Sequence, residues 1–233
     1  MSTASEDAAV GSGAGSPAGR RDRTRITRLR EKGRTERAEL DALLDSTHVG
    51  HFAFVGPDGE PRILPTAVVR DGDRVLAHGS TGSPWLRALA AGAPTTLAVT
   101  AVDGLVVARS AFESSVHYRS AVLFGRCTEL GARDKARALD LITDALLPGR
   151  VAELRAPHDR ELSATLVLAL DIEEWSVKVS DKWPEDPEDD VNGDAWAGVV
   201  PSVVVHTEPR PAPDLRAGIA LPESVRRLLR HPL

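Results

Sequence analysis

The amino-acid sequence predicts a mainly β domain of the α+β class, built around a closed antiparallel barrel with a few flanking helices. Apolar segments of strand length recur between turn signals spaced by roughly 8–12 residues, and few segments have helical periodicity. A doubly wound sheet would instead place a helix between successive strands. The chain has 233 residues, 42% of them apolar and 27% charged, which suits one soluble domain with extensions.

Three strands in meander order are expected to follow a short amphipathic helix at residues 36–45. The strands are predicted at residues 49–56, 62–70 and 74–79. Apolar and polar residues alternate along them, and the turn signals Pro57–Gly59 and Asp71–Gly72 separate them. These segments therefore predict antiparallel hairpins.

A second helix is predicted from Ser83, an N-cap residue followed by Pro84 at the first helical position. Further strands are expected at residues 95–102, 105–112, 118–130 and 164–180. The turn signal Asp103–Gly104 separates the first two of these, and the last is expected to cross a bend or bulge after residue 172. A third helix at residues 133–147 interrupts the strands, and the barrel is expected to have seven or eight strands in all.

The charge distribution gives no general affinity for nucleic acid or anionic membranes. The formal net charge is −5, although residues 20–37 are rich in arginine and residues 171–195 are rich in acids. We expect the basic segment to pack on the protein's own acidic segments. The single cysteine, Cys127, excludes disulfides within the chain, and residues 1–19 lack the apolar core of a signal peptide, so a cytoplasmic protein is expected.

The segment His78–Trp85 is the first candidate binding site. A strand ends at Gly79, hydroxyl residues follow, and a helix begins. Backbone amides at such a helix N-terminus, with the hydroxyls of Ser80, Thr81 and Ser83, can receive a phosphate. The same residues also fit a plain glycine and serine turn capped by Ser83, and both interpretations stay open.

Arg119, between Tyr118 and Ser120 on a predicted strand, is the second candidate. An arginine in an apolar region must pair with an acid or bind an anion, because an unpaired buried charge is strongly destabilising. An ion pair with one of the protein's own acids is the alternative. The sequence contains no metal-ligand pattern, nucleotide-binding glycine loop or nucleophile elbow, and Cys127 within an apolar strand is expected to be inert.

Several of these stretches together resemble the pyridoxamine 5'-phosphate oxidase-like split-barrel flavoproteins, in the flavin-nucleotide-binding branch that includes the nitroimidazole-resistance reductases. The resemblance runs from about Arg25 to about Pro201. Its landmarks, in chain order, are residues 50–66, 74–83, 103–125, Lys178 and 184–201. It divides the chain into a disordered tail at residues 1–24, an FMN-binding split-barrel domain at 25–201 and a C-terminal extension at 202–233.

The resemblance implies a homodimer with two FMN molecules in clefts at the subunit interface, and an FMN-dependent oxidoreductase that acts on a small-molecule substrate without a metal ion. His78 would be the catalytic residue, as a hydrogen-bonding or proton-donating group beside the flavin. Trp183 and Trp196 would cover the cleft near the substrate. By motif position, the residues expected to bind FMN are Pro65, Thr66, His78, Gly79, Ser80, Thr81, Ser83, Arg87, Tyr118, Arg119, Ser120 and Lys178.

One departure from the family pattern leaves other cofactors open. Many relatives carry a basic pair after the glycine and serine turn, whereas this chain has Ser83, Pro84 and Trp85, with Arg87 as the nearest cation. Some members of this fold bind haem or deazaflavin. The alternatives are therefore a haem-binding or haem-degrading protein, with His78 as the iron ligand, and a non-catalytic ligand-binding accessory protein.

Overall fold

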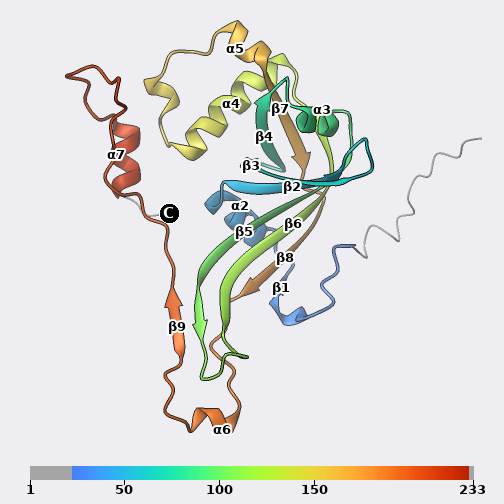
Figure 1. The fold of residues 1–233 in the computed structure, drawn as a ribbon. Coiled ribbons are helices and arrows are strands. Elements are labelled where there is room, and N and C mark those ends of the chain that lie inside the picture. Colours follow the sequence, from blue (N-terminus) through green and yellow to red (C-terminus); the bar gives the residue numbers. More distant parts are fainter. Residues whose placement is uncertain (1–22, 231–233) are drawn as a thin grey trace, which may run out of the picture.

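The computed structural model describes residues 23–230, which form one nine-stranded antiparallel sheet and several helices (Figure 1). The strands are β1 (Gly33–Arg34), β2 (Val49–Val55), β3 (Pro61–Asp71), β4 (Arg74–Ser80), β5 (Pro94–Val107), β6 (Ser115–Glu129), β7 (Thr165–Asp171), β8 (Glu174–Ser180) and β9 (Gly198–Pro201). The helices are η1 (Arg30–Lys32), α2 (Arg37–Ser46), α3 (Pro84–Ala90), α4 (Ala132–Leu146), η2 (Val151–Glu153), α5 (Asp159–Ala164), α6 (Glu188–Val191) and α7 (Glu223–Arg230). Most of the tail expected to be disordered, residues 1–22, lies outside the described residues.

Six of the strands close into a barrel. The sheet order is β1-β8-β6-β7-β4-β3-β2-β5-β9, and an additional pairing between β5 and β6 joins the ends of the run from β6 to β5. β8 lies beside β6 and β9 beside β5, outside this ring. The predicted antiparallel split barrel is therefore confirmed, although six strands close it instead of the expected seven or eight. Within the described part of the chain, no helix has the length and apolar character needed to cross a membrane.

β5 and β6 each pair with different strands along their two halves, which splits the barrel. β2 pairs with residues 95–99 of β5, whereas β9 pairs with residues 104–107 of the same strand. β6 pairs with β8 through residues 118–124 and with β7 through residues 127–129. The two long strands therefore extend beyond the barrel as a ribbon, and the segment with α6 lies at the far end of that ribbon (Figure 1).

The turn predicted at Asp103–Gly104 is wrong, because β5 runs through these residues without reversing. Its register with β6 shifts between Val102 and Gly104, so Asp103 is the extra residue of a bulge. The Asp103 carboxylate accepts hydrogen bonds from Arg119 of β6. A Cβ atom on Gly104 would lie 2.8 Å from the carbonyl oxygen of Val200, so this glycine allows β9 to approach closely.

The strand predicted at residues 164–180 is two strands, β7 and β8, because the chain leaves the first at Ile172–Glu173. β7 pairs with β4 and β6, whereas β8 pairs with β1 and β6. The strand predicted at residues 105–112 is also wrong, because residues 105–107 are the end of β5 and residues 108–114 form bends and turns. The remaining predicted strands and the three predicted helices are confirmed to within a few residues. The sequence patterns do not predict β1, β9 or the helices α5, α6 and α7, all of which are short.

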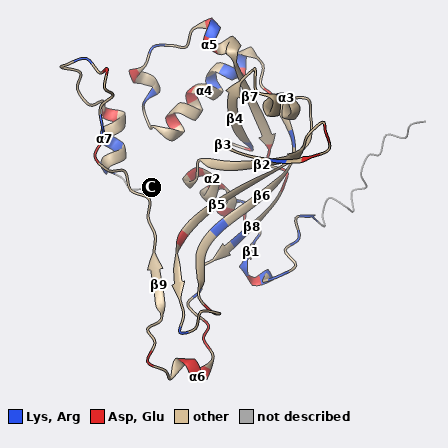
Figure 2. Cartoon of the chain, viewed as in Figure 1, with Lys and Arg blue, Asp and Glu red and all other residues tan. Residues whose placement is uncertain are grey.

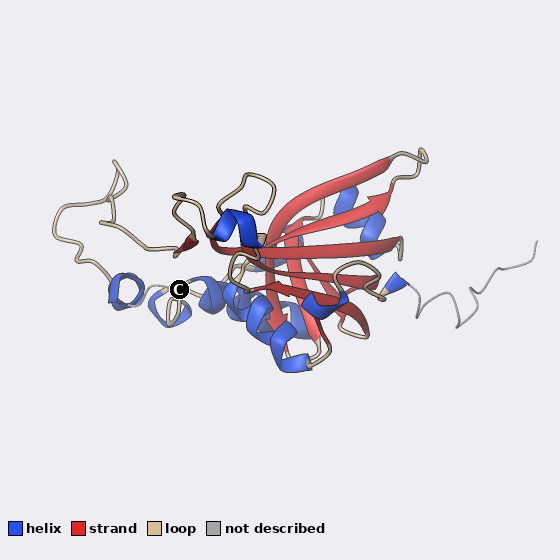
Figure 3. Cartoon of the chain, turned by 90° about the horizontal axis from the view of Figure 1, so that it is seen from below, coloured by secondary structure: helices blue, strands red, loops and turns tan. Residues whose placement is uncertain are grey.

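Two apolar cores lie on opposite sides of the barrel wall. Phe52, Leu97 and Leu123 are buried inside the barrel, where α2 and α3 add further leucines. Leu76 and Val167 belong to a second core, which lies outside the barrel and beneath α4. Several helices lie along one side of the strands (Figure 3), so much of the remaining outer surface has no helix over it.

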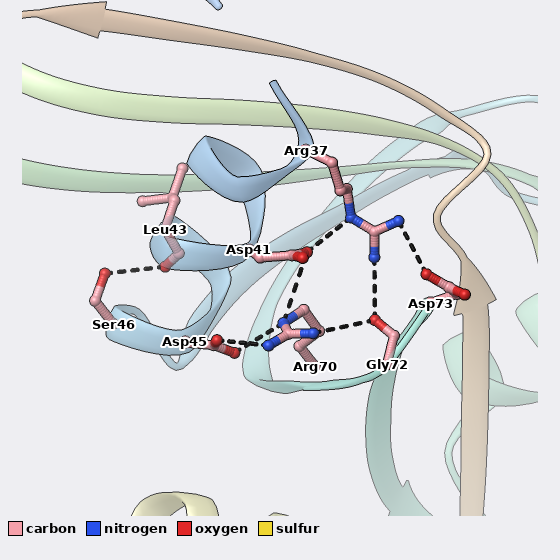
Figure 4. A network of polar contacts seen from close by, with 8 residues as sticks. All are labelled: Arg37, Asp41, Leu43, Asp45, Ser46, Arg70, Gly72 and Asp73. Atoms are coloured by element: carbon pink, nitrogen blue, oxygen red, sulfur yellow. Dashed lines mark hydrogen bonds and ion pairs between the residues drawn. The ribbon is translucent and has the colours of Figure 1, made fainter. Parts of the chain in front are cut away.

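Ion pairs connect α2 to the turn between β3 and β4 (Figure 4). Arg37 of α2 pairs with Asp73 at 3.0 Å, and Arg70 of β3 pairs with Asp45 of α2 at 2.6 Å. Both guanidinium groups also donate a hydrogen bond to the carbonyl oxygen of Gly72. These contacts hold the helix against the turn.

The expected packing of the basic N-terminal segment on acidic segments is confirmed for two arginines. Arg23 pairs with Glu174 of β8 at 2.6 Å, and Arg34 of β1 pairs with Asp181 at 3.4 Å. Further acids of the C-terminal half gather on α6 (Figure 2). The basic segment therefore neutralises part of the protein's own negative charge.

Candidate functional site

Four residues of the expected FMN site lie together on the outer surface of the barrel: Pro65, Tyr118, Ser120 and Lys178. Ala121 and Leu123 of β6 are buried inside the barrel, so the alternating residues Tyr118 and Ser120 face outward. Lys178 of β8 lies opposite Ser120 and shares its face. Within the described part of the chain, the Lys178 ammonium group has no hydrogen bond or ion pair, so it is available to an anion.

His51 of β2 and Thr100 of β5 belong to the same surface, although no sequence motif singles them out. Thr100 lies opposite Ser120, and His51 lies opposite Pro65 of β3. The buried Phe52 shows that its neighbour His51 points outward. The alternation of apolar residues in the predicted hairpin is the signal that could have identified His51. The outer barrel face is defined here by His51, Pro65, Thr100, Tyr118, Ser120 and Lys178 and by the exposed aliphatic residues Val49, Val55 and Ile63.

Arg119 and Thr66 face the other side of the barrel wall. Arg119 Nε and Nη2 donate to the two carboxylate oxygens of Asp103 at 3.0 and 2.9 Å, and Nη1 donates to Ser46 Oγ at 3.2 Å. The hydrogen bonds to Asp103 raise the pKa of Arg119. Thr66 lies opposite the buried Gly50. Of the two interpretations of Arg119, the structure shows the ion pair with one of the protein's own acids, Asp103.

His78 lies on another part of the barrel surface. Ala77 belongs to the interior core and Leu76 to the core beneath α4, so strand alternation directs His78 toward the α4 side. Its ring is half-buried, and Nδ1 is buried without a hydrogen-bond partner in the described residues. Burial lowers the pKa of His78, which keeps the imidazole neutral at neutral pH. At Gly79 a Cβ atom would lie 2.6 Å from Leu86 Cδ1, so this glycine allows α3 to pack on β4.

The turn after β4 is closed by its own hydrogen bonds. The Thr81 amide donates to the last carbonyl of α5 at 2.9 Å, and the Ser83 amide donates to the Ser80 carbonyl at 2.9 Å. The amide of Gly82 donates to Ser80 Oγ at 3.1 Å, while the Ser83 side chain caps no amide of α3. The amides of Thr81, Gly82 and Ser83 in the expected phosphate cradle are therefore already engaged. The groups that remain available to a ligand include the hydroxyls of Thr81 and Ser83 and the exposed Arg87 of α3.

The two candidate substrate residues lie far from His78 in a single chain. Trp183 and Trp196 belong to the segment between β8 and β9, at the far end of the ribbon, and both are exposed. The Trp196 ring packs beside Gly198, where a Cβ atom would lie 2.7 Å from the ring. In the barrel, β7 separates His78 on β4 from β6, and β3 and β2 separate it from β5. One chain alone therefore does not bring the predicted residues into one pocket.

His48 is a second histidine with an unpartnered nitrogen, and sequence reasoning missed it. Its Nδ1 is buried without a hydrogen-bond partner in the described residues, and burial lowers its pKa against the opposing effect of Asp45. It lines a cavity of about 570 Å³ between α2, β3 and α4, beside Arg70 and Arg137. Both arginines are paired with acids. Among the described residues, no three histidine, cysteine or acidic side chains are grouped to hold a metal ion.

A family model described as pyridoxamine 5'-phosphate oxidase matches residues 36–179, and the chain belongs to this family. The family resemblance read from the sequence motifs is therefore confirmed. A search of the curated proteins found no match.

Two solved structures are similar over most of the chain. The FAD and haem binding protein from Mycobacterium smegmatis is 51% identical, with a TM-score of 0.82, over 84% of this chain and 97% of that one. A flavocytochrome from Azotobacter vinelandii is 35% identical, also with a TM-score of 0.82, over 89% of this chain and 96% of that one. The similarity therefore includes sequence as well as fold.

Proposed function

We propose that this protein is a redox protein that binds a flavin and a haem, and that it does so as a homodimer. Its family and its 51% identity to a protein described as FAD and haem binding support the proposal. The observation that carries it is the unpartnered imidazole of His78. A neutral histidine with an available ring nitrogen is a common axial ligand of haem iron.

The surroundings of His78 fit an iron ligand better than a structural histidine. A buried histidine that only supports the fold normally has hydrogen bonds to its ring nitrogens, and His78 has none in the described residues. Its lowered pKa keeps the imidazole neutral, as iron ligation requires. Because Nδ1 is the buried atom, Nε2 is the nitrogen that would face a ligand. Haem, when bound, supplies one-electron chemistry, and His78 would hold it and tune its potential.

The outer barrel face provides the groups that a flavin needs. Lys178 offers an unpaired cation to a phosphate or to the anionic flavin ring, and Ser120, Thr100 and Tyr118 add hydroxyl groups beside it. We propose FAD as the flavin, because the relative with 51% identity is described as binding FAD. FMN, which the family resemblance implies, is the alternative that the test below distinguishes.

A second copy of the chain would complete the site. The outer barrel face exposes Val49, Val55 and Ile63, and an apolar surface of this kind on a soluble protein marks an interaction site. In a homodimer with twofold symmetry, each copy covers the outer barrel face of the other, so both faces are buried at once. The flavin would then lie between the two copies, and Trp183 and Trp196 of one ribbon would reach the cleft of the other copy.

Absorption spectroscopy of the purified protein, reconstituted with haem and FAD, tests this function. The wild-type chain should show both a Soret band and flavin bands. His78→Ala should lose the Soret band of ligated haem and keep the flavin, whereas His48→Ala should keep both. If His78→Ala retains the wild-type Soret band, the haem assignment is wrong, and if His48→Ala alone loses it, the ligand is His48.

Chromatography of the flavin released from the protein as purified, before any reconstitution, distinguishes FAD from FMN. Lys178→Met should weaken flavin binding by about tenfold or more, as expected when a charge-assisted hydrogen bond is lost. Lys182→Met is the matched control, because that lysine is exposed and pairs with Glu185 outside the barrel face. Equal flavin affinity in the two variants would exclude Lys178 from the flavin site. A wild-type chain without flavin and haem would refute the proposed function.

A further inference from the structure

We propose that residues 202–222 form an arm that packs on the outer barrel face of a second copy of this chain. The inference deepens the homodimer of the proposed function, because it names the segment that one copy contributes to the surface of the other. It rests on the exposure, the fixed ends and the composition of this segment.

The arm exposes more aliphatic surface than a connecting segment does. Val203, Val204 and Val205 are consecutive, and their relative exposures are 74%, 66% and 57%. Leu215 and Ile219 are exposed further along. Flexible linkers are rich in glycine and serine or in charged residues, because exposed aliphatic side chains are unfavourable in water. The composition therefore indicates a segment that is covered in the working assembly.

Both ends of the arm are attached to the body of the same chain, whereas its middle is not. At the start, the Ser202 amide donates to the Asp103 carbonyl at 2.9 Å. At the end, the amide and hydroxyl of Ser224 in α7 donate to the Glu153 carboxylate at 3.0 and 2.6 Å. Between these points, the backbone hydrogen bonds of the described structure join residues three apart in the chain, such as the bond from the Leu215 amide to the Ala212 carbonyl. The arm thus passes from the ribbon to the helices without packing on its own barrel (Figure 1).

The composition of the arm before its first turn makes this part stiff and extended. Pro209 and Pro211 favour an extended polyproline-type backbone up to the turn in which the Leu215 amide donates to the Ala212 carbonyl. A stiff segment loses little conformational entropy when it docks. The arm is therefore suited to lie along a preformed surface.

The surface available to such an arm is the outer barrel face. Its exposed Val49, Val55 and Ile63 are aliphatic, as are the arm residues Val203–Val205. β9, from which the arm leaves, pairs with β5, the strand that carries Thr100 of the same face. A twofold axis beside β5 would therefore carry the arm of each copy across the barrel of the other, over the proposed flavin site.

Photo-crosslinking of the full-length chain tests this contact. A p-benzoylphenylalanine residue at position 204 should give a covalent dimer on irradiation, with the linked peptide in β2 or β3. The same residue at position 154, which is also exposed but lies on the helix side between η2 and α5, is the matched control and should give much less dimer. Mixing isotope-labelled with unlabelled chains shows whether a crosslink joins two copies. Crosslinks within one chain, or equal yields at the two positions, would overturn the proposal.

A charge in the arm provides a second measurement. Val204→Glu should raise the dimer dissociation constant by about tenfold or more in sedimentation equilibrium, whereas Leu154→Glu, at an exposed position on the helix side, should leave it unchanged. An unchanged constant for Val204→Glu, or a wild-type chain that is monomeric, overturns the arm contact. Flavin content is measured on the same samples. A dimer that binds flavin but lacks the crosslink refutes the arm alone, and a crosslinked dimer without flavin or haem refutes the proposed function alone.

Discussion

Replacing Arg119 by alanine distinguishes a structural role of this arginine from a role in anion binding. In the fold, its guanidinium group makes two hydrogen bonds to Asp103 and one to Ser46. It also faces away from the outer barrel face, where the proposed flavin site lies. We therefore predict that Arg119→Ala lowers the free energy of unfolding and leaves flavin affinity nearly unchanged.

The structure sets the size of the expected loss. Two unit charges about 4 Å apart interact by about 4 kcal/mol at an effective dielectric constant of about 20. The side chains of Arg119 and Asp103 are 31% and 39% exposed, so water screens the pair, and fully exposed pairs contribute only about 0.2–1 kcal/mol. For the partly exposed pair of Arg119 and Asp103 we therefore expect an intermediate coupling energy of about 1–2 kcal/mol. This corresponds to a fall in melting temperature of roughly 2–8 °C for a chain of this size.

A double-mutant cycle measures the coupling. Urea denaturation of Arg119→Ala, Asp103→Ala and the double variant should show a combined loss smaller than the sum of the single losses by the coupling energy. Arg160→Ala, in which an exposed arginine of α5 is removed, is the control and should change stability little. The reasoning is refuted if Arg119→Ala unfolds like the wild type and binds flavin at least about tenfold more weakly, because Arg119 is then an anion ligand.

Three further predictions concern the barrel interior and the C-terminal helix. Gly50→Ala should lower the free energy of unfolding by about 1–3 kcal/mol, because the new Cβ atom would lie 2.7 Å from a leucine methyl group. Gly131→Ala is the control and should leave the free energy of unfolding unchanged, because no atom lies within 4 Å of the new Cβ atom. Chemical denaturation of both variants measures the difference. The hydrogen bond from the Ser224 hydroxyl is the main cause that lowers the pKa of Glu153 from 4.5 to about 2. Ionised Glu153 therefore stabilises the attachment of α7 at pH values above about 4.5, and this stabilisation is lost as the pH falls through about 2. In Ser224→Ala, an NMR titration of the Glu153 carboxyl group should therefore have its midpoint nearer 4.5, and an unchanged midpoint would contradict this contact. Burial raises the pKa of Cys127 to about 12, so thiol reagents at about pH 8 should modify it only after unfolding; rapid labelling of the native protein would show that the thiol is accessible.

Local sequence patterns were sufficient for most of the secondary structure. The alternation in residues 49–56 and 62–70, with a turn signal between them, predicts the hairpin of β2 and β3. Ser83 and Pro84 likewise predict the start of α3. These signals work because a hairpin turn or a helix start involves residues that are neighbours in the chain.

Long-range pairing decided the points at which the sequence prediction failed. Asp103–Gly104 has the composition of a turn, yet β5 continues because β6 pairs with it on both sides of the bulge and Arg119 binds the Asp103 carboxylate. The break at Ile172–Glu173 arises because β7 and β8 pair with different strands. These partner strands are distant in sequence from β7 and β8, so the local sequence does not predict which strands pair.

The sequence by itself determined the family, the strand that carries His78 and the presence of cationic and hydroxyl residues suited to a phosphate cofactor. Only the tertiary structure decided which of these groups are available to a ligand. It leaves His78 and Lys178 without partners in the described residues, engages the amides of the turn after β4 and pairs Arg119 with Asp103. The physical reason is that availability depends on which atoms a side chain meets across the barrel wall, and that follows from strand register and packing between segments distant in the chain.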